Sequence, residues 1–330
     1  MKLLSAVEPL LELRDLSRYY RVKSKKNPFL KQQIKAVDRL SLSIYPGETF
    51  GLVGESGCGK STAGHVLAGI LPPTAGEIRY GGKSFSAMSG REKAAARREI
   101  QIVLQDPSAS LNPKRKIGWI VGEPLLINAD YSKQARQRLV AEMLETVGLD
   151  ESCASRYPHE LSGGQRQRVN IAAALMLASK LLVADEVVSA LDVSVQSQIL
   201  NLLKKLQRTR QLTYLFISHD LNVVQYMSDR LGVMYLGRLV EYGAVDDIYG
   251  DARHPYTKAL LSTMPSVADR GVERIILEGE VPSLLAPPSG CAFHTRCRQA
   301  RDLCRQTPPE MREICRGHYA CCHFALENKG

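Results

Sequence analysis

Alternating and apolar segments along this chain predict a mixed α/β protein. Residues 10–13 and 35–44 alternate partly between apolar and polar side chains, which predicts half-buried antiparallel strands. Short, mainly apolar runs predict buried strands at residues 49–53, 100–104, 181–186 and 212–217. A closing hairpin is expected around Gly237. Such strands, separated by helical patterns, are typical of an α/β core that follows an antiparallel β start.

The middle of the chain has a different pattern. Strand-like alternation is absent from residues 108–160. Within this region, apolar residues recur at helical spacing at Leu139, Met143, Leu144 and Val147. The helical stretches are expected to be interrupted at Pro113, Pro124 and Pro158. These features predict a helical insertion in the α/β core, which we place at about residues 108–175.

The last part of the chain is expected to form a separate extension. We place the end of the core domain at residue 262 and assign residues 263–330 to a small C-terminal extension. Its first part is predicted to be an extended linker because it contains Pro265, Pro282, Pro287 and Pro288. Residues 274–277 predict one strand within that linker.

Composition narrows the class of protein without choosing a partner. The chain has 330 residues, of which 44% are hydrophobic and 24% charged, as in an ordinary globular protein. No apolar run approaches the roughly 18 residues that a membrane-spanning helix needs, and residues 1–8 are too short and too soon acidic for a signal peptide. The net charge of +10 permits association with nucleic acid or an anionic membrane face. A cytosolic location is therefore expected.

A phosphate-binding loop is the strongest motif in the sequence. It follows the predicted strand at residues 49–53 and consists of Gly54, Glu55, Ser56, Gly57, Cys58, Gly59, Lys60, Ser61 and Thr62, which match G-x-x-x-x-G-K-[ST]. Its glycines let backbone N–H groups surround phosphate oxygens at the start of a helix. Lys60 is expected to reach the β- and γ-phosphates, and Ser61 to reach Mg²⁺. A glycine-rich turn without a ligand is the simpler alternative, but matching partners occur downstream.

Polar residues follow three of the other predicted strands. Gln105 ends the strand at 100–104, where an amide can contact Mg²⁺ and an attacking water. Asp185 and Glu186 end the next strand, and such carboxylates can hold Mg²⁺ and orient or deprotonate water. His219 follows the strand at 212–217 and can bond a γ-phosphate. Taken alone, Gln105 and His219 would be ordinary loop residues.

Three further features complete the set of candidates. Residues 161–165 read Leu-Ser-Gly-Gly-Gln and open a helix, which is a second turn suited to an anion. Asp192 ends the Ser-Ala-Leu-Asp segment after the carboxylates. Tyr20 precedes a basic loop and would either stack on an adenine ring or pack on the sheet; position alone does not choose between these.

Taken together and in this order, the motifs resemble the ATP-binding cassette of ABC proteins over residues 9–262. The resemblance implies a P-loop NTPase fold with a RecA-like core, an antiparallel β subdomain and a helical subdomain. It also implies that two cassettes dimerise head to tail and hydrolyse ATP. Ser162, Gly163, Gly164 and Gln165 would then contact ATP held mainly by the partner cassette.

The same resemblance assigns roles to the remaining candidates. Tyr20 aligns with the adenine-stacking aromatic, and Asp192 with the D-loop. Mg²⁺ would be bound by Ser61, Gln105 and Asp185. Glu186 would assist the attacking water, together with Gln105, while His219 holds the γ-phosphate.

Several longer segments narrow the resemblance to the ATPase subunits of dipeptide and oligopeptide importers. These segments are residues 105–113, 156–160, 188–196, 254–257, 279–283 and 287–291; residues 123–128 favour the F-type subunit of dipeptide permeases. The family implies two transmembrane permease partners, a second and non-identical ABC ATPase subunit, and indirectly an extracytoplasmic solute-binding protein. A peripheral position on the cytoplasmic face of the inner membrane is then expected, without a nucleic-acid partner. The ATPase does not touch the cargo, so nickel chelates or other solutes stay open as alternatives to peptides.

Two residues depart from the family pattern. Val187 stands where the family usually has proline, directly after the catalytic glutamate. Ala173 stands where the family usually has arginine, in the helix that residues 161–165 open. Since proline fixes φ and lacks a donor, Val187 is expected to loosen the turn between Glu186 and Asp192. Activity is predicted to survive at a reduced level.

The eight cysteines are unevenly distributed, with six in residues 291–330. In a cytosolic chain such a group favours metal binding over disulfides. Cys291, Cys297, Cys304 and Cys322 resemble the tail of several peptide-importer ATPases that binds a [4Fe–4S] cluster. Four thiolates suit iron–sulfur or zinc, and their spacing does not settle which. Reduced packing cysteines are the third alternative, and Cys321 is the alternative fourth ligand.

Two other functions are compatible with parts of the sequence. A soluble ABC ATPase that acts on nucleic acid or ribosomes would use the net positive charge, but such proteins commonly carry two cassettes or a long coiled-coil insertion. A non-enzymatic metal-binding regulator on an inactive cassette would not need Lys60, Asp185, Glu186 and His219, all of which are present. We therefore expect an importer ATPase.

Overall fold

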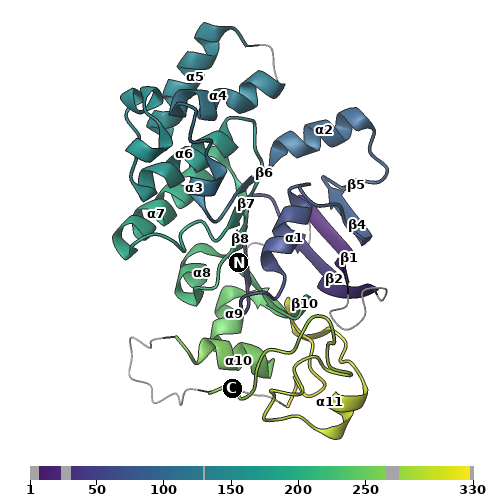
Figure 1. The fold of residues 1–330 in the computed structure, drawn as a ribbon. Coiled ribbons are helices and arrows are strands. Elements are labelled where there is room, and N and C mark those ends of the chain that lie inside the picture. The colour runs from purple at the N-terminus through teal and green to yellow at the C-terminus, as the bar shows by residue number, and fades with distance from the viewer. Residues whose placement is uncertain (1–6, 24–30, 129–130, 265–274, 328–330) are drawn as a thin grey trace. The chain divides into compact units, whose positions relative to one another are not determined.

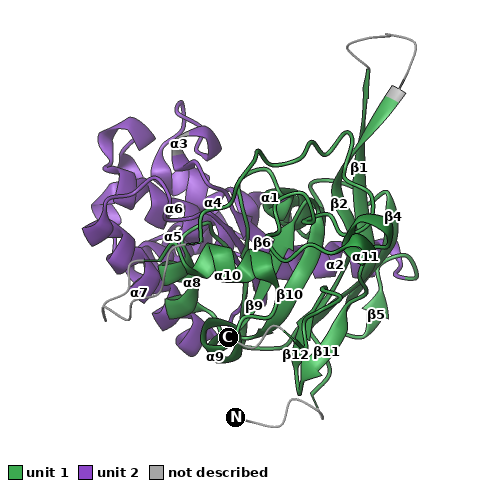
Figure 2. Ribbon diagram, turned by 90° about the horizontal axis from the view of Figure 1, so that it is seen from below, with its two compact units in different colours: residues 1–87, 217–330 green, residues 88–216 purple. Residues whose placement is uncertain are grey.

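A computed structural model describes residues 7–23, 31–128, 131–264 and 275–327. The chain forms two compact units (Figure 2). Unit 1 comprises residues 1–87 and 217–330, and unit 2 comprises residues 88–216. The predicted boundary at residue 262 divides the chain differently and stays a prediction. Within the described ranges, no helix is long and apolar enough to cross a membrane.

Unit 1 begins with an antiparallel sheet, as the alternating segments predicted. Its strands β1 (Leu11–Lys23), β2 (Lys31–Ile44), β4 (Ala75–Tyr80) and β5 (Lys83–Ser84) lie in the order β2-β1-β4-β5. The pair Leu11 and Ile44 fixes the β1–β2 register, and both side chains are fully buried. One face of this sheet therefore belongs to the core of the unit.

The second sheet of unit 1 carries the phosphate loop at one end. Its strands β3 (Thr49–Val53), β9 (Arg230–Tyr235), β10 (Arg238–Ala244), β12 (His318–Ala320) and β11 (Arg312–Cys315) lie in the order β11-β12-β10-β9-β3. β3 runs parallel to β9, and β9 and β10 form the predicted hairpin around Gly237. The β11–β12 hairpin joins the C-terminal segment to this sheet, with Tyr242 stacked on Tyr319 at 4.6 Å.

Short helices complete unit 1. They are α1 (Lys60–Leu67), α8 (Leu221–Met227), α9 (Val245–Gly250), α10 (Pro255–Leu261) and α11 (Asp302–Gln306) (Figure 1). The predicted strand at 274–277 is wrong for its described part, since residues 275–277 are irregular. The side chain of Ile276 is 64% exposed, and the backbone N–H of Ile275 donates to the hydroxyl of Ser262 instead of to a neighbouring strand.

Unit 2 contains the predicted helical insertion. Three buried strands, β6 (Ile100–Val103), β7 (Leu181–Asp185) and β8 (Thr213–Ile217), lie in the order β8-β7-β6, with β6 and β7 parallel. The helices of the unit are α2 (Gly90–Glu99), α3 (Pro107–Ser110), α4 (Ile117–Asn128), α5 (Lys133–Thr146), α6 (Gly163–Leu175) and α7 (Val193–Arg210). Two 3₁₀ turns cover Glu151–Ser155 and Pro158–Glu160.

The insertion is helical because its polar caps and apolar spacing agree. Ser132 caps α5 by accepting from the N–H of Ala135, and Met143 and Leu144 are buried on the inner face of the helix. Pro124 was expected to interrupt a helix, but it lies inside α4. Residues 108–160 contain no strand over their described part, as the pattern predicted.

Candidate functional site

The phosphate loop of unit 1 is closely enclosed by backbone. Gly54 and Gly59 have φ values of +153° and +107°. A Cβ atom on Gly59 would lie 2.0 Å from the carbonyl oxygen of Ala36, and one on Gly54 would lie 2.3 Å from that of Met234. Only glycine fits at these two positions, because both the space and the backbone conformation exclude a side chain.

The start of α1 is arranged for an anion. Gly59 is the N-cap residue, and no side chain accepts a hydrogen bond there. The ammonium group of Lys60 lies inside the loop and donates to the carbonyl oxygens of Gly54 and Glu55 at 2.7 and 3.1 Å. Ser61 follows as the second residue of the helix. A positive charge and a helix N-terminus therefore converge on the same loop.

Glu55 is held by two residues from the C-terminal part of the chain. Its backbone N–H donates to the hydroxyl of Tyr256 at 2.9 Å. Its carboxylate accepts from both terminal nitrogens of Arg296, at 2.8 and 3.1 Å. The sequence motif did not reveal these contacts, because Arg296 is 241 positions away and belongs to no nucleotide-binding pattern.

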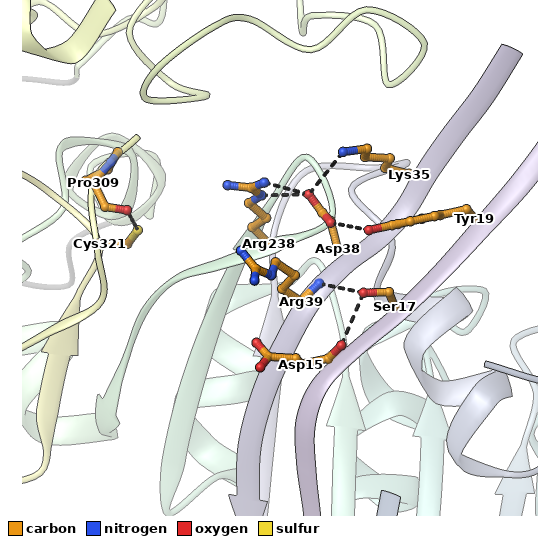
Figure 3. A network of polar contacts seen from close by, with 9 residues as sticks. All are labelled: Asp15, Ser17, Tyr19, Lys35, Asp38, Arg39, Arg238, Pro309 and Cys321. Carbon is orange, nitrogen blue, oxygen red and sulfur yellow. Dashed lines mark hydrogen bonds and ion pairs between the residues drawn. The ribbon is translucent and has the colours of Figure 1, made fainter. Parts of the chain in front are cut away.

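The two tyrosines of β1 differ in how they are fixed. The hydroxyl of Tyr19 donates to Asp38, which also accepts from Arg238 at 2.7 Å (Figure 3). Burial alone would raise the pKa of Asp38, but the hydrogen bonds from Tyr19 and Arg238 lower it below its usual range. Tyr20 is half-buried, with the Arg18 guanidinium 4.8 Å from its ring centroid. Each ring therefore lies near a cation, since Lys35 is 5.6 Å from the ring centroid of Tyr19, and Tyr19 is additionally fixed by the bond from its hydroxyl to Asp38.

His219 lies in the loop between β8 and α8 and is exposed. The preceding residue, Ser218, donates its N–H to the carbonyl oxygen of Leu52 at 3.3 Å. Leu52 is in β3, two residues before Gly54. The structure therefore places the residue before His219 beside the strand that leads into the phosphate loop.

The carboxylates of unit 2 lie at one end of its parallel strands. Asp185 is the last residue of β7 and is 3% exposed. Glu186 follows with φ +49°, a left-handed conformation that is uncommon for a glutamate. Its carboxylate accepts a hydrogen bond from the amide of Gln105 at 2.8 Å. Gln105 and Glu186, which follow the separate strands β6 and β7, are thus in direct contact.

The Leu-Ser-Gly-Gly-Gln segment at residues 161–165 leads into α6, and side chains of this segment cap the helix. The hydroxyl of Ser162 accepts from the N–H of Gln165, and the Gln165 side chain accepts from the N–H of Ser162 at 3.0 Å. Ser162 and Gly163 are exposed, whereas Gly164 faces Val195 of α7 so closely that a Cβ would lie 2.4 Å from a methyl carbon. The conformation of this turn is therefore fixed by its own capping side chains.

Asp192 caps the next helix, α7. Its carboxylate accepts from the N–H of Val195 and from the hydroxyl of Ser194, and these bonds lower the pKa of Asp192. The residues before it form a tight turn, in which the N–H and the hydroxyl of Ser189 both donate to the carbonyl oxygen of Glu186. Val187 within this turn is 2% exposed.

The four predicted cysteine ligands line one cavity in unit 1. Cys291, Cys297, Cys304 and Cys322 surround it together with Phe293 and Phe324. The adjacent Cys321 is directed elsewhere, since its thiol donates to the carbonyl oxygen of Pro309 (Figure 3). Burial raises the pKa of the Cys291 thiol to about 12, so the thiol is protonated at neutral pH. Among the described residues, no group of three or more His, Cys, Asp or Glu side chains is arranged to hold a metal ion.

Two families match this sequence. The family described as ABC transporter matches residues 37–189, and the family described as oligopeptide/dipeptide transporter, C-terminal region, matches residues 240–304.

Curated relatives match nearly the whole chain. The oligopeptide transport ATP-binding protein AppF of Bacillus subtilis (strain 168) is 48% identical over 321 residues, covering 96% of this chain and 98% of AppF. The dipeptide transport ATP-binding protein DppF of Escherichia coli (strain K12) is 48% identical over 322 residues, covering 97% and 95% of the two chains.

Solved structures match a smaller part of the chain. A dimeric, post-hydrolysis structure of the ATP-binding cassette MJ0796 bound to ADP and Pi has a TM-score of 0.63 and 28% identity. The match covers 71% of this chain and 98% of that one. The cbiO1 structure from Clostridium perfringens, part of the ABC transporter complex cbiONQ, also has a TM-score of 0.63, at 27% identity over 74% and 91% of the two chains.

Proposed function

The chain belongs to the ABC transporter family, and we propose that it is the ATP-hydrolysing subunit of an importer of dipeptides or oligopeptides. The observation that carries the proposal is the near-complete match, at 48% identity, to transport ATP-binding proteins of these two cargo classes. The enclosed phosphate loop with Lys60 inside it supports ATP binding. The alternative of a soluble ATPase acting on nucleic acid is not favoured by any of these relatives.

In this proposal ATP lies between two cassettes. The phosphate loop of one chain binds the phosphates, with Lys60 neutralising their charge, and Tyr20 stacks on the adenine. Ser162, Gly163, Gly164 and Gln165 of the other chain contact the same nucleotide through the exposed start of α6. The MJ0796 relative was solved as a dimer bound to ADP and Pi, which supports a dimer here.

The residues that carry out hydrolysis are assigned from the family pattern. Ser61, Gln105 and Asp185 offer the oxygen ligands that Mg²⁺ prefers, and the bound ion would offset charge on the phosphates. Glu186 orients and deprotonates the attacking water, and its bond to Gln105 fixes the carboxylate before the substrate arrives. His219 holds the γ-phosphate, and Asp192 belongs to the facing surface of the dimer.

A groove in unit 2 supports docking of a permease. Its lining consists of Ala94, Arg97, Arg98, Gln101, Glu123, Pro124, Ile127 and Leu177. The side chains of Ile127 and Leu126 on α4 are 75% and 45% exposed, which is unusual for large apolar residues. We propose that a cytoplasmic segment of a permease covers them. The chain would then be peripheral on the cytoplasmic face of the inner membrane, beside a second, non-identical ATPase. The solute-binding protein would lie on the opposite side of the membrane and would be only an indirect partner.

We also propose that the cysteine cavity holds a [4Fe–4S] cluster. Four thiols around one cavity are a donor set that such a cluster takes. Zinc is the alternative occupant, since four thiolates are also a donor set for zinc. When bound, the cluster would cross-link the ends of the C-terminal segment.

The cysteine proposal has a matched pair of variants. Anaerobically purified protein should contain iron and acid-labile sulfide and show broad visible absorption. C322S should lose most of the iron, whereas C321S should retain it, because of these two neighbours Cys322 lines the cavity and Cys321 bonds to Pro309. Colourless, zinc-loaded wild type would contradict the cluster, and equal iron in both variants would contradict the choice of ligand.

The function is tested by purification from native cells in mild detergent. Two multi-span permeases and a second cassette ATPase should co-purify, and the complex should hydrolyse ATP. The solute-binding protein that serves these permeases is then titrated with dipeptides, longer peptides and nickel chelates. The ligand that it binds identifies the cargo. Recovery with ribosomes or nucleic acid, or without a membrane partner, would reject the importer while leaving the ATPase intact.

A further inference from the structure

The side chain of Glu55 connects the phosphate loop to the C-terminal part of the chain. Its carboxylate forms a two-bond pair with the guanidinium of Arg296, at 2.8 and 3.1 Å. The Arg296 side chain is 7% exposed and that of Glu55 is 25% exposed. Such bidentate, partly buried pairs are geometrically specific as well as strong. The hydrogen bonds that Arg296 donates to Glu55 also raise the pKa of Arg296, so the guanidinium stays charged.

Arg296 is fixed in turn by aromatic packing. Its backbone N–H donates to the carbonyl oxygen of Phe293 at 3.0 Å. The ring of Phe293 is 2% exposed and lies 5.3 Å from that of Tyr235 and 5.4 Å from that of Tyr256. Tyr256 also accepts the hydrogen bond from the N–H of Glu55. The backbone and the side chain of one loop residue are therefore held by the same packed cluster.

We propose that Arg296 is a positioning residue for the phosphate loop, acting through Glu55, so that nucleotide affinity depends on the folding of residues 291–297. The inference rests on the proposed function, since it requires that the loop binds nucleotide. Linkage makes the dependence reciprocal: a nucleotide that selects one shape of the loop also stabilises the segment that holds this shape. Cys291 and Cys297 bound this segment, so changes in their cavity reach the loop through Arg296.

The test compares four full-length chains. R296Q removes the charge and the fork, and R296K keeps the charge without the bidentate geometry. R298Q is the matched control, because Arg298 is two positions away, 60% exposed, and contacts Glu278 and the carbonyl oxygen of Ile276 instead of the loop. Two quantities are measured for each variant and wild type: the Kd for MgADP, and hydrogen exchange in residues 291–298 with and without MgADP.

The proposal predicts a Kd raised about tenfold in R296Q, a smaller rise in R296K, and no change in R298Q. MgADP should slow exchange in residues 291–298 of wild type and R298Q but not of R296Q. A wild-type Kd in R296Q, or equal exchange with and without MgADP in wild type, would overturn the inference. If wild type does not bind MgADP at all, the proposed function itself has failed, and the exchange experiment is not needed to see it.

Discussion

The first turns of α1 and α6 are both glycine-rich and both suited to an anion, but they are completed differently. At α1 the N-cap is Gly59, and no side chain accepts a hydrogen bond there. At α6 Ser162 and Gln165 cap each other, and the turn is exposed. A nucleotide phosphate can therefore accept hydrogen bonds at the start of α1, where no side chain caps the helix. At the start of α6, side chains already accept such bonds. In the proposed dimer, the first turn would bind the nucleotide of its own chain and the second would contact the nucleotide of the other chain.

Replacing Lys60 would remove the main positive charge from the first turn. K60A should lower both MgATP binding and ATP hydrolysis by about 100-fold or more, because the ammonium inside the loop is lost. Nucleotide binding to the isolated chain and hydrolysis by the complex are measured. K83A, a lysine of β5 outside the motifs, is the control. Retained binding in K60A would contradict the assignment of the first turn.

The two glycines of the second turn separate packing from nucleotide contact. In G164A the new methyl group collides with Val195, so the free energy of unfolding should fall by about 1–3 kcal/mol. In G163A the nearest atom is at 3.6 Å, so stability should change little while hydrolysis falls. Chemical denaturation and ATPase assays on both variants give the comparison. Equal stabilities would show that α6 can shift away from α7 at little cost.

Removing the side-chain cap of α6 should have a smaller effect on stability than G164A, and the effect should be confined to the first turn of the helix. S162A should cost about 1 kcal/mol of stability, because the N–H of Gln165 loses its acceptor. Hydrolysis by the assembled complex should fall roughly tenfold, whereas the Kd of the isolated chain for MgADP should stay the same. A weaker Kd in the isolated chain would mean that the second turn serves the nucleotide of its own chain, against the comparison above.

Val187→Pro leaves both helix starts unchanged and tests the turn after β7. Since proline restricts the backbone directly after Glu186, V187P should raise the steady-state ATPase rate of the complex, at most about twofold. The variant is compared with wild type at saturating MgATP. Equal rates would show that valine at this position does not limit hydrolysis, and that the departure from the family pattern has no catalytic consequence.

Local patterns predicted most of the elements and failed where local information was weakest. The strand–loop–helix around residues 49–67 and the helical insertion followed from spacing, caps and glycines within short windows. The predicted strand is wrong over residues 275–277, because extended, partly apolar residues become a strand only beside a partner strand. The predicted helix interruption at Pro124 is wrong for a related reason. A proline can lie inside a helix such as α4 when the surrounding packing supports it.

The sequence by itself determined the ATP-binding chemistry, because its phosphate loop consists of nine neighbouring residues whose backbone closes on itself. Only the tertiary structure decided the pairings between distant residues. Gln105 meets Glu186 across 81 positions, Arg296 meets Glu55 across 241, and Cys322 instead of Cys321 faces the cavity. Such contacts leave no periodic signal in the chain, since they arise when separately folded elements pack and bring their ends together.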